Sequence, residues 1–205
     1  REFERFHHRI KRIKPRPELI IAGGSVPPGL PTNIYYDIIM EAKELGVKTI
    51  LDSDGKWLAE GINAKPYLIK PNVREAQELL NTVFTNEADI IKAAHTLVKQ
   101  GIEIVVISRG AEGLIAATKQ ETIIAIPPRV RVRSTVGAGD CTIAGLALNL
   151  RQGKPLLEAC RLAVAMGSAA VLTKGSELCN RQDVEILLPR ITVYPLGAKT
   201  RRASA

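Results

Sequence analysis

The sequence predicts an α/β fold in which a mostly parallel central sheet is covered by helices on both faces, a three-layer α/β/α arrangement. Short apolar, β-branched runs, typical of buried strands, alternate with helical patterns of ten or more residues. Glycine-rich or polar junctions follow the expected strands, where parallel sheets commonly bind ligands. With 205 residues, of which 45% are hydrophobic, the chain can bury the core of one domain.

The first half of the chain is punctuated by turn residues. Pro31 favours a helix start and Gly46 a helix end, whereas residues 23–29 contain too much Gly and Pro for regular structure and predict a loop. A charged helix over 2–14 should end at Pro15, because proline interrupts helices. We expect strands over 18–22, 47–52, 66–70 and 102–108, and helices over 31–45, 72–80 and 87–100.

The second half begins with a hairpin and ends in helices. Two apolar runs, 114–118 and 122–126, flank Lys119-Gln120, and this pattern predicts two antiparallel strands joined by a tight turn. An alternating Arg and Val segment then leads into a glycine-rich turn. We expect the last three helices over 138–151, 155–172 and 180–188.

The ends of the chain are basic and its body is nearly neutral. Residues 1–16 hold seven Lys or Arg and two Glu, and residues 190–205 hold four Lys or Arg and no acid, so of a total charge of +8 the body retains −1. We therefore expect a basic N-terminal helix over 1–16, a folded core over 17–189, and a disordered basic tail over 190–205. A body without a basic face predicts no nucleic-acid partner.

Composition also bears on location. No apolar run approaches the ~20 residues of a membrane span, and the Arg-rich start lacks a signal-peptide core, so we expect no membrane partner. The three cysteines, Cys141, Cys160 and Cys179, form no Cys-x-x-Cys pair, which argues against a disulfide framework and a structural zinc site. These features favour a cytoplasmic protein.

The stretch Ser134-Thr135-Val136-Gly137-Ala138-Gly139-Asp140 precedes an apolar helix. Small residues allow a tight turn that exposes N–H groups at the positive end of the helix dipole, a favourable place for an anion. A carboxylate beside that anion can accept the proton of an attacking hydroxyl. We therefore predict a kinase of small hydroxylated molecules, with residues 137–139 as anion hole and Asp140 as base; the alternative is a well-capped helix start.

Two further clusters follow expected strands. Asn72 and Glu75 lie on one helix face, and their oxygens suit a hydrated Mg²⁺; the alternative is a capping arrangement without metal. Ser108-Arg109-Gly110-Ala111-Glu112-Gly113 predicts a glycine-lined wall near a nucleotide, or an ordinary turn. Asp52 could contact substrate hydroxyls or only start a turn. The strand-end residues should lie along one rim of the sheet.

Taken together, these residues resemble the ribokinase or PfkB-type carbohydrate kinases. The segment 134–140 is similar to the C-terminal signature of that family. The segments 24–29 and 70–75 are similar to the phosphosugar kinases, namely the minor 6-phosphofructokinase, 1-phosphofructokinase and tagatose-6-phosphate kinase. The segment 174–179 also resembles the minor 6-phosphofructokinase branch. The resemblance covers residues 2–188.

The resemblance implies roles for individual residues. It makes Asp140 the catalytic base and Gly137, Ala138 and Gly139 the oxyanion cradle for ATP-dependent phosphorylation of a phosphosugar. It implies that Asn72 and Glu75 orient Mg²⁺ through water, that Ser25 faces the sugar phosphate, and that the loop 173–177 forms an adenine wall and a K⁺ site. The nucleotide-binding residues expected on this basis are Lys70, Asn72, Ser108, Gly110, Gly113, Thr173 and Gly175.

The sequence also departs from the family. The family's N-terminal portion supplies a substrate-binding aspartate, a Gly-Gly motif and a small β-sheet lid that forms the dimer contact, and we find no counterpart in these 205 residues. We therefore expect the C-terminal portion of a ribokinase-like fold that lacks the lid, from a protein that is a homodimer when complete. The alternative function is an inactive nucleotide-binding fragment that needs a partner chain.

Overall fold

The computed structural model describes residue 10 and residues 12–197, and it divides the chain into two compact units. Unit 1 comprises Arg1–Ser108 with Ala117–Lys119, and unit 2 comprises Arg109–Ala116 with Gln120–Ala205. Most of the helix expected over 2–14, and the last part of the expected tail, lie outside the described residues. The seven strands follow the order β1 to β7 in a mostly parallel sheet, which confirms the predicted α/β class.

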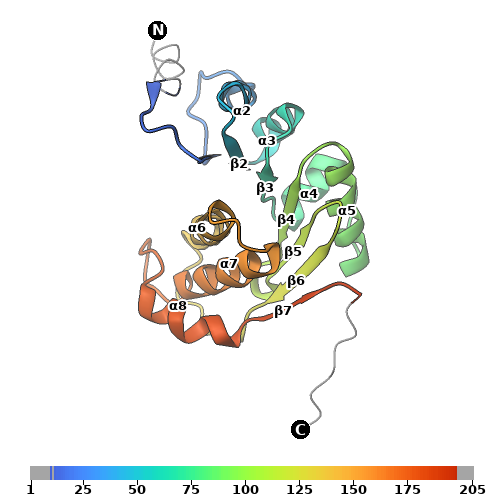
Figure 1. The fold of residues 1–205 in the computed structure, drawn as a ribbon. Helices are drawn as coiled ribbons and strands as arrows, with labels where there is room; N and C mark the ends of the chain where they lie inside the picture. The colour runs from blue at the N-terminus through green and yellow to red at the C-terminus, as the bar shows by residue number, and fades with distance from the viewer. Residues whose placement is uncertain (1–9, 11, 198–205) are drawn as a thin grey trace. The chain divides into compact units, whose positions relative to one another are not determined.

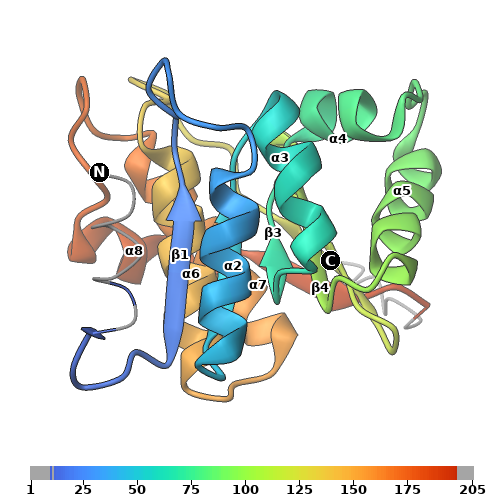
Figure 2. The same cartoon turned by 90° about the horizontal axis from the view of Figure 1, so that it is seen from above.

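Unit 1 contains alternating strands and helices, as expected (Figure 1). The helices α2 and α3 pack against each other (Figure 2) and against β2, and α5 packs against β4. The elements of unit 1 are β1 (Leu19–Gly23), α2 (Ile34–Glu44), β2 (Lys48–Asp52), α3 (Gly55–Gly61), the 3-10 helix η1 (Ile62–Ala64), β3 (Leu68–Ile69), α4 (Val73–Leu80), α5 (Glu87–Lys99) and β4 (Ile104–Ser108).

The four strands of unit 1 pair in parallel. Ile21 lies opposite Ile50, Leu51 opposite Ile69, and Leu68 opposite Ile104. Central strand residues are inaccessible to water, as are the helix residues packed on them, and burying each aliphatic side chain contributes about 1.5–3 kcal/mol. This core holds the carboxyl ends of β2, β3 and β4 in fixed register. Its fully buried side chains include Ile39, Ile50, Leu51, Leu68, Ile69, Leu97 and Ile107.

Unit 2 contains the expected hairpin segments and the last helices. Its strand β6 pairs in an antiparallel manner with β7, and α7 packs against both strands. The elements of unit 2 are the 3-10 helix η2 (Gly110–Glu112), β5 (Leu114–Ala117, whose last residue falls in unit 1), β6 (Thr122–Ile126), α6 (Ala138–Arg151), α7 (Leu156–Ala170), α8 (Arg181–Leu187), the 3-10 helix η3 (Leu188–Arg190) and β7 (Thr192–Pro195).

The helices α6 and α7 approach so closely that two glycines are required between them. A Cβ on Gly145 would lie 2.6 Å from the Cα of Ala163, and a Cβ on Gly167 would lie 2.4 Å from the hydroxyl oxygen of Thr142. The obstacle at Gly145 is backbone, which cannot rotate away as a side chain can. The two helices therefore form one closely packed pair that carries the glycine-rich turn before α6.

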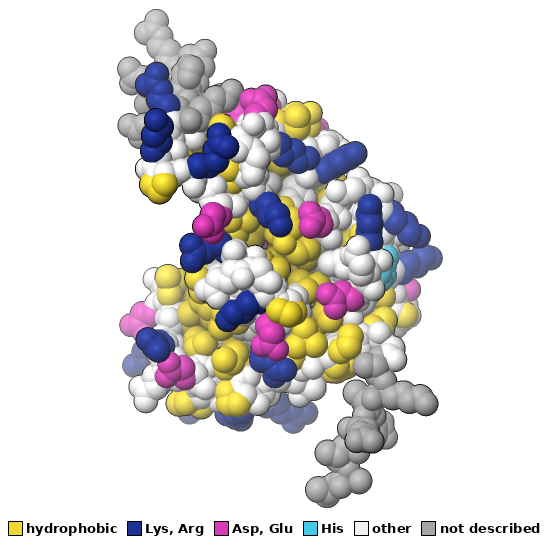
Figure 3. Space-filling model, viewed as in Figure 1, with side chains coloured by type: hydrophobic (Ala, Val, Ile, Leu, Met, Phe, Trp, Pro, Cys, Tyr) yellow, Lys and Arg dark blue, Asp and Glu magenta, His cyan; other side chains and the backbone are white. Residues whose placement is uncertain are grey.

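One α-helix and one β-strand were not predicted. Helix α3 occupies Gly55–Gly61, where we expected only a polar turn after Asp52; its seven residues are too few for a clear helical period. Strand β7 occupies Thr192–Pro195, within the segment expected to be a disordered tail. Pairing of Tyr194 with Ile124 and of Val193 with Ala125 orders this segment, so the prediction was wrong there. Basic and acidic side chains are interspersed on the face shown in Figure 3. No described helix is long and apolar enough to span a bilayer.

Candidate functional site

In unit 1, two predicted site residues form an ion pair at the carboxyl ends of neighbouring strands. The ammonium of Lys70 lies 3.1 Å from a carboxylate oxygen of Asp52. Only 6% of Lys70 is exposed, and its backbone N–H donates to the carbonyl of Leu51 at 3.3 Å. A charge so far withdrawn from water requires a partner. Asp52 supplies the opposite charge, so its role extends beyond beginning a turn.

The loop after β1 is tied to the same strand end. The N–H of Gly24 donates to the carbonyl of Asp52 at 3.1 Å, and the hydroxyl of Tyr35 donates to the carbonyl of Gly24 at 2.8 Å. A Cβ on Gly23 would lie 2.6 Å from the Asp52 carbonyl oxygen, so only glycine allows this approach. Ser25, the expected substrate residue, follows in this loop and is exposed. The role of Tyr35 was not predicted, because one tyrosine in a helical pattern carries no such signal.

Asn72 and Glu75 form a complete capping box at the start of α4. The Asn72 side-chain oxygen accepts from the N–H of Glu75 at 2.9 Å, and a Glu75 carboxylate oxygen accepts from the N–H of Asn72 at 2.9 Å. Burial raises the pKa of Glu75, and the charges of Asp52 and Asp54 raise it further, while the Asn72 hydrogen bond and Lys70 lower it. The half-buried carboxyl thus belongs to the same electrostatic cluster as the ion pair.

Ser108 ends β4 beside Asn72. The two residues form a parallel bridge, and the N–H of Ser108 donates to the carbonyl of Pro71 at 3.0 Å. Unit 1 therefore gathers five predicted site residues at the carboxyl ends of three strands. They are Asp52, Lys70, Asn72, Glu75 and Ser108.

In unit 2, the turn before β5 depends on two glycines with left-handed backbone. Gly110 has a φ of 59° and Gly113 a φ of 83°. The N–H of Arg109 donates to the carbonyl of Gly113 at 2.8 Å, which closes the turn. A Cβ on Gly113 would lie 2.0 Å from the Ala125 carbonyl oxygen. Gly113 is buried against the hairpin, whereas Gly110 is exposed, so only Gly110 can offer backbone to a ligand.

The glycine-rich turn of unit 2 adopts the geometry expected of an anion site. Gly137 is the N-cap of α6, has a φ of 77°, and provides no side-chain cap. The N–H of Ala138 donates to the carbonyl of Thr135 at 3.3 Å. Helix geometry leaves the N–H groups of Gly139 and Asp140 without intrahelical partners. Both residues are exposed, so a carboxylate and open N–H donors lie together at the positive end of a 14-residue helix.

The loop after α7 is fastened to this turn. The hydroxyl of Ser134 donates to the carbonyl of Gly175 at 2.6 Å, and the hydroxyl of Thr173, which is buried, contacts the carbonyl of Glu177 at 2.6 Å. Leu178 lies against the turn, because a Cβ on Gly137 would meet its Cδ2 at 3.1 Å. The structure therefore brings the segments 134–140 and 173–178 together, although about forty residues separate them in sequence.

Cys141 and Cys179 form a further contact between α6 and the segment that follows α7. The N–H of Cys179 lies 3.4 Å from the Sγ of Cys141. Burial raises the pKa of Cys179 to about 11, and the hydrogen bond and charge of Cys141 add to the effect. Cys141 is buried in the first turn of α6, and the raised pKa of Cys179 keeps that thiol protonated near neutral pH. Nothing in the spacing of these residues identified the pair beforehand.

The chain matches the family model for the pfkB family of carbohydrate kinases over residues 2–183. It belongs to that family. Among curated pfkB relatives, the ATP-dependent 6-phosphofructokinase isozyme 2 of Escherichia coli is 34% identical over 186 residues, which are 90% of this chain and 60% of the relative. The 1-phosphofructokinase of Borreliella burgdorferi is 35% identical over 193 residues, covering 94% and 62%. The tagatose-6-phosphate kinase of Staphylococcus epidermidis is 34% identical over 196 residues, covering 94% and 63%.

Solved pfkB structures agree. The phosphofructokinase-2 of E. coli in complex with potassium superposes with a TM-score of 0.87 at 32% identity, over 92% of this chain and 62% of that one. The chain thus spans about 60% of the length of the pfkB relatives it matches. The family resemblance predicted from the sequence is confirmed.

The residues predicted to orient magnesium in this pfkB chain fit an indirect role. Each Glu75 oxygen is already engaged by Asn72, but a carboxylate has about four acceptor positions. Direct coordination would compete with the capping box, whereas a water of the hydrated ion can approach the remaining positions. Among the described residues, no group of three or more His, Cys, Asp or Glu side chains could hold a metal by itself.

Proposed function

We propose that this chain takes part in ATP-dependent phosphorylation of a phosphosugar hydroxyl, of the fructose-6-phosphate type. One observation carries the proposal: exposed Asp140 stands in the first turn of α6 immediately after left-handed Gly137, beside open backbone N–H donors. A proton acceptor and an anion site in one turn are what phosphoryl transfer to an alcohol requires. The similarity to phosphofructokinases and tagatose-6-phosphate kinase supports the substrate class.

The proposed step is an in-line displacement. The sugar hydroxyl oxygen forms a bond to the γ-phosphorus of ATP, the bond from that phosphorus to the β–γ bridging oxygen breaks, and ADP leaves. The hydroxyl proton passes to Asp140. The N–H groups of the turn, residues 137–139, stabilise the charge on the phosphoryl oxygens, and positioning carries most of the rate because the transition state is loose.

The remaining predicted residues are assigned to binding. In unit 1, Lys70, Asn72 and Ser108 are proposed to contact the nucleotide, and Ser25 and Asp52 the sugar. In unit 2, Gly110, Thr173 and Gly175 are proposed nucleotide neighbours, with Gly113 supporting the turn. Asn72 and Glu75 would hold Mg²⁺ through water, an ion that neutralises phosphate charge when bound. The loop 173–177 is the proposed K⁺ site; the potassium complex of E. coli phosphofructokinase-2 supports K⁺ as an ion that this family binds.

Calorimetric titration of the 205-residue chain with a non-hydrolysable ATP analogue and Mg²⁺, alone and with fructose-6-phosphate, tests the proposal. We expect nucleotide binding that tightens when the sugar is present, followed by ADP release when ATP replaces the analogue. Nucleotide binding that is indifferent to fructose-6-phosphate, fructose-1-phosphate and tagatose-6-phosphate would reduce the proposal to nucleotide binding alone. Absence of nucleotide binding would overturn it.

A further inference from the structure

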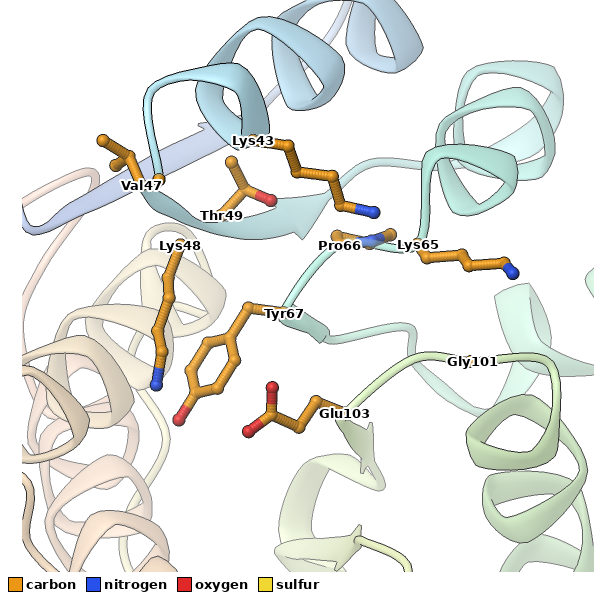
Figure 4. Close-up of a pocket in the computed structure, with 10 residues that line it drawn as sticks. Lys43, Val47, Lys48, Thr49, Lys65, Pro66, Tyr67, Gly101 and Glu103 are labelled. Carbon is orange, nitrogen blue, oxygen red and sulfur yellow. The ribbon is translucent and has the colours of Figure 1, made fainter.

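A pocket of about 240 Å³ lies within unit 1 at the amino ends of its strands, away from the residues discussed so far. Three lysines from three different segments line it: Lys43 in the last turn of α2, Lys48 at the start of β2, and Lys65 after η1. Figure 4 shows these side chains with Tyr67 and Glu103, which precede β3 and β4. We name this the amino-end pocket. With one carboxylate among three ammonium groups, it favours an anion.

The lysines are held in place. The ammonium of Lys43 donates to the carbonyl of Ala64, which leaves two of its three donor positions for another partner. The ammonium of Lys48 lies 4.1 Å from the centroid of the Tyr67 ring, a cation–π contact. Cationic groups fixed in this way lose less conformational entropy when they bind a ligand.

Lys65 is fixed by its backbone and by its stem. Its φ of 52° is left-handed, a conformation that is unfavourable for a non-glycine residue. Its Cδ would be 3.0 Å from a Cβ on Gly101, so the lysine stem packs where that glycine leaves room. A strained backbone and a fitted stem keep this cation at the pocket wall.

Lys43 and Lys65 are close enough to affect each other. Burial lowers the pKa of Lys43, and the charge of Lys65 lowers it further. Two ammonium groups that repel each other in the folded protein are an unfavourable arrangement, which an anion placed between them would relieve. The pocket geometry and this repulsion therefore both favour an anionic ligand.

The size and the other wall of the pocket narrow the ligand class. Known small-molecule pockets are usually ~300–1,000 Å³, so 240 Å³ suits a compound smaller than a nucleotide. Glu103 lies near the Tyr67 ring, where its charge adds to the effect of burial in raising the pKa of the Tyr67 phenol. A carboxylate can accept hydrogen bonds only, so it would select hydroxyl groups.

We propose that the amino-end pocket binds a small hydroxylated phosphate ester, with the phosphate against Lys43 and Lys65 and a hydroxyl group donating to Glu103. The site is separate from the residues of the proposed phosphoryl transfer. In each of β2, β3 and β4, the pocket residue precedes or begins the strand and a predicted site residue ends or follows it: Lys48 and Asp52, Tyr67 and Lys70, Glu103 and Ser108.

Amide-resolved NMR titration of the full chain tests this assignment, with inorganic phosphate, glycerol 3-phosphate and, as an ionic-strength control, sodium chloride. We expect saturable shifts at the amides of Tyr67 and Glu103 with both phosphates, and tighter binding of glycerol 3-phosphate. Shifts at Gly139 report the proposed active site separately, so failure of one site is distinguishable from failure of the other.

Variants separate a built site from general basicity. Lys65→Met should weaken phosphate binding about tenfold or more, since hydrogen bonds to charged groups contribute about 1.5–3 kcal/mol. Lys65→Arg should retain binding, and Lys154→Met, an equal charge loss at an exposed lysine of unit 2, should leave it unchanged. Glu103→Gln should remove the preference for glycerol 3-phosphate.

Three results would overturn the proposal. Lys65→Met could bind phosphate as tightly as the wild type, or chloride could reproduce the phosphate shifts; either would reduce the pocket to nonspecific basicity. Equal affinity for inorganic phosphate and glycerol 3-phosphate would reject the ester assignment. Lys65→Met alters an exposed side chain and keeps the backbone requirement of position 65, so the variant is expected to fold.

Discussion

The ammonium of Lys70 lies 3.1 Å from the carboxylate of Asp52. Lys70 is buried, so its charge depends on Asp52 for compensation. Replacement of Lys70 by Met should leave Asp52 without this cation and lower the free energy of unfolding by about 1–3 kcal/mol, because the carboxylate that remains is only partly exposed to water. Urea denaturation measures the effect.

The matched double variant distinguishes a lost ion pair from a lost side chain. The double variant Lys70→Met, Asp52→Asn should lose less unfolding free energy than the two single variants lose in sum. The difference, which is the interaction free energy, should be about 1 kcal/mol or more. Strict additivity would show that the two side chains do not depend on each other.

Asp140→Asn should lower kcat by about 10²–10⁴-fold, the range of general base catalysis, and weaken nucleotide binding only modestly. Steady-state ADP release and calorimetry measure the two effects. The control is Asp183→Asn, since Asp183 is also the third residue of a helix. Turnover retained in Asp140→Asn would remove Asp140 from the role of base.

Gly137→Ala should impair nucleotide binding in addition to stability. The left-handed φ of 77° costs an alanine about 1–2 kcal/mol, and the new methyl group would also press on Leu178. Gly153→Ala is the control, because Gly153 has a φ of 68° and no neighbour within 4 Å of a Cβ. Thermal unfolding should show a stability loss for Gly153→Ala and a loss at least as large for Gly137→Ala, because only the latter also presses on a neighbour. Equal nucleotide affinity in both would argue against an anion site at Gly137.

Glu75→Gln separates capping from charge. Glutamine can maintain the capping box, so α4 should remain intact while the water-mediated Mg²⁺ contact weakens; a Mg²⁺ titration of nucleotide binding measures this. Glu75→Ala should lose the cap as well, at about 1 kcal/mol. Wild-type affinity for Mg²⁺-nucleotide in Glu75→Gln would restrict Glu75 to the cap.

The same variant tests the pH dependence. The folded pKa of Glu75 is raised above its ordinary 4.5, so the folded state holds this proton more tightly than the unfolded state. The corresponding stability is present below 4.5 and is lost as pH rises through the folded pKa. Between a pH just above 4.5 and neutral pH, the free energy of unfolding should therefore fall more in the wild type than in Glu75→Gln. Parallel denaturation curves at both pH values check this.

Most helices and strands could be predicted from the apolar periodicity of the sequence and from the Gly and Pro residues that mark their ends. Helix α6 begins and ends where predicted, because Gly137 marks its start and the apolar pattern continues to Arg151. The missed elements are short: α3 has seven residues and β7 has four. An edge strand such as β7 is defined by its pairing with β6, which is a long-range contact that local propensity does not encode.

The sequence indicated which residues lie at the strand ends of the candidate site, but it did not indicate their side-chain partners. Asp52, Lys70, Asn72 and Ser108 were expected because they follow strands. The ion pair, and the bond from Ser134 to Gly175, depend on which segments become neighbours in space. The order of motifs along the chain indicates the elements, but side-chain partners follow from tertiary packing.

The contact between Gly145 and Ala163 has a consequence for mutational tolerance. A Cβ at position 145 would force α6 away from α7. Asp140 lies five residues earlier in the same helix, so it would move as well. A displacement of about 1 Å at a reacting group can reduce a rate about a hundredfold. In a saturation library selected for activity, position 145 should therefore be among the most intolerant sites of the chain, although its residue has no side chain and no part in the chemistry.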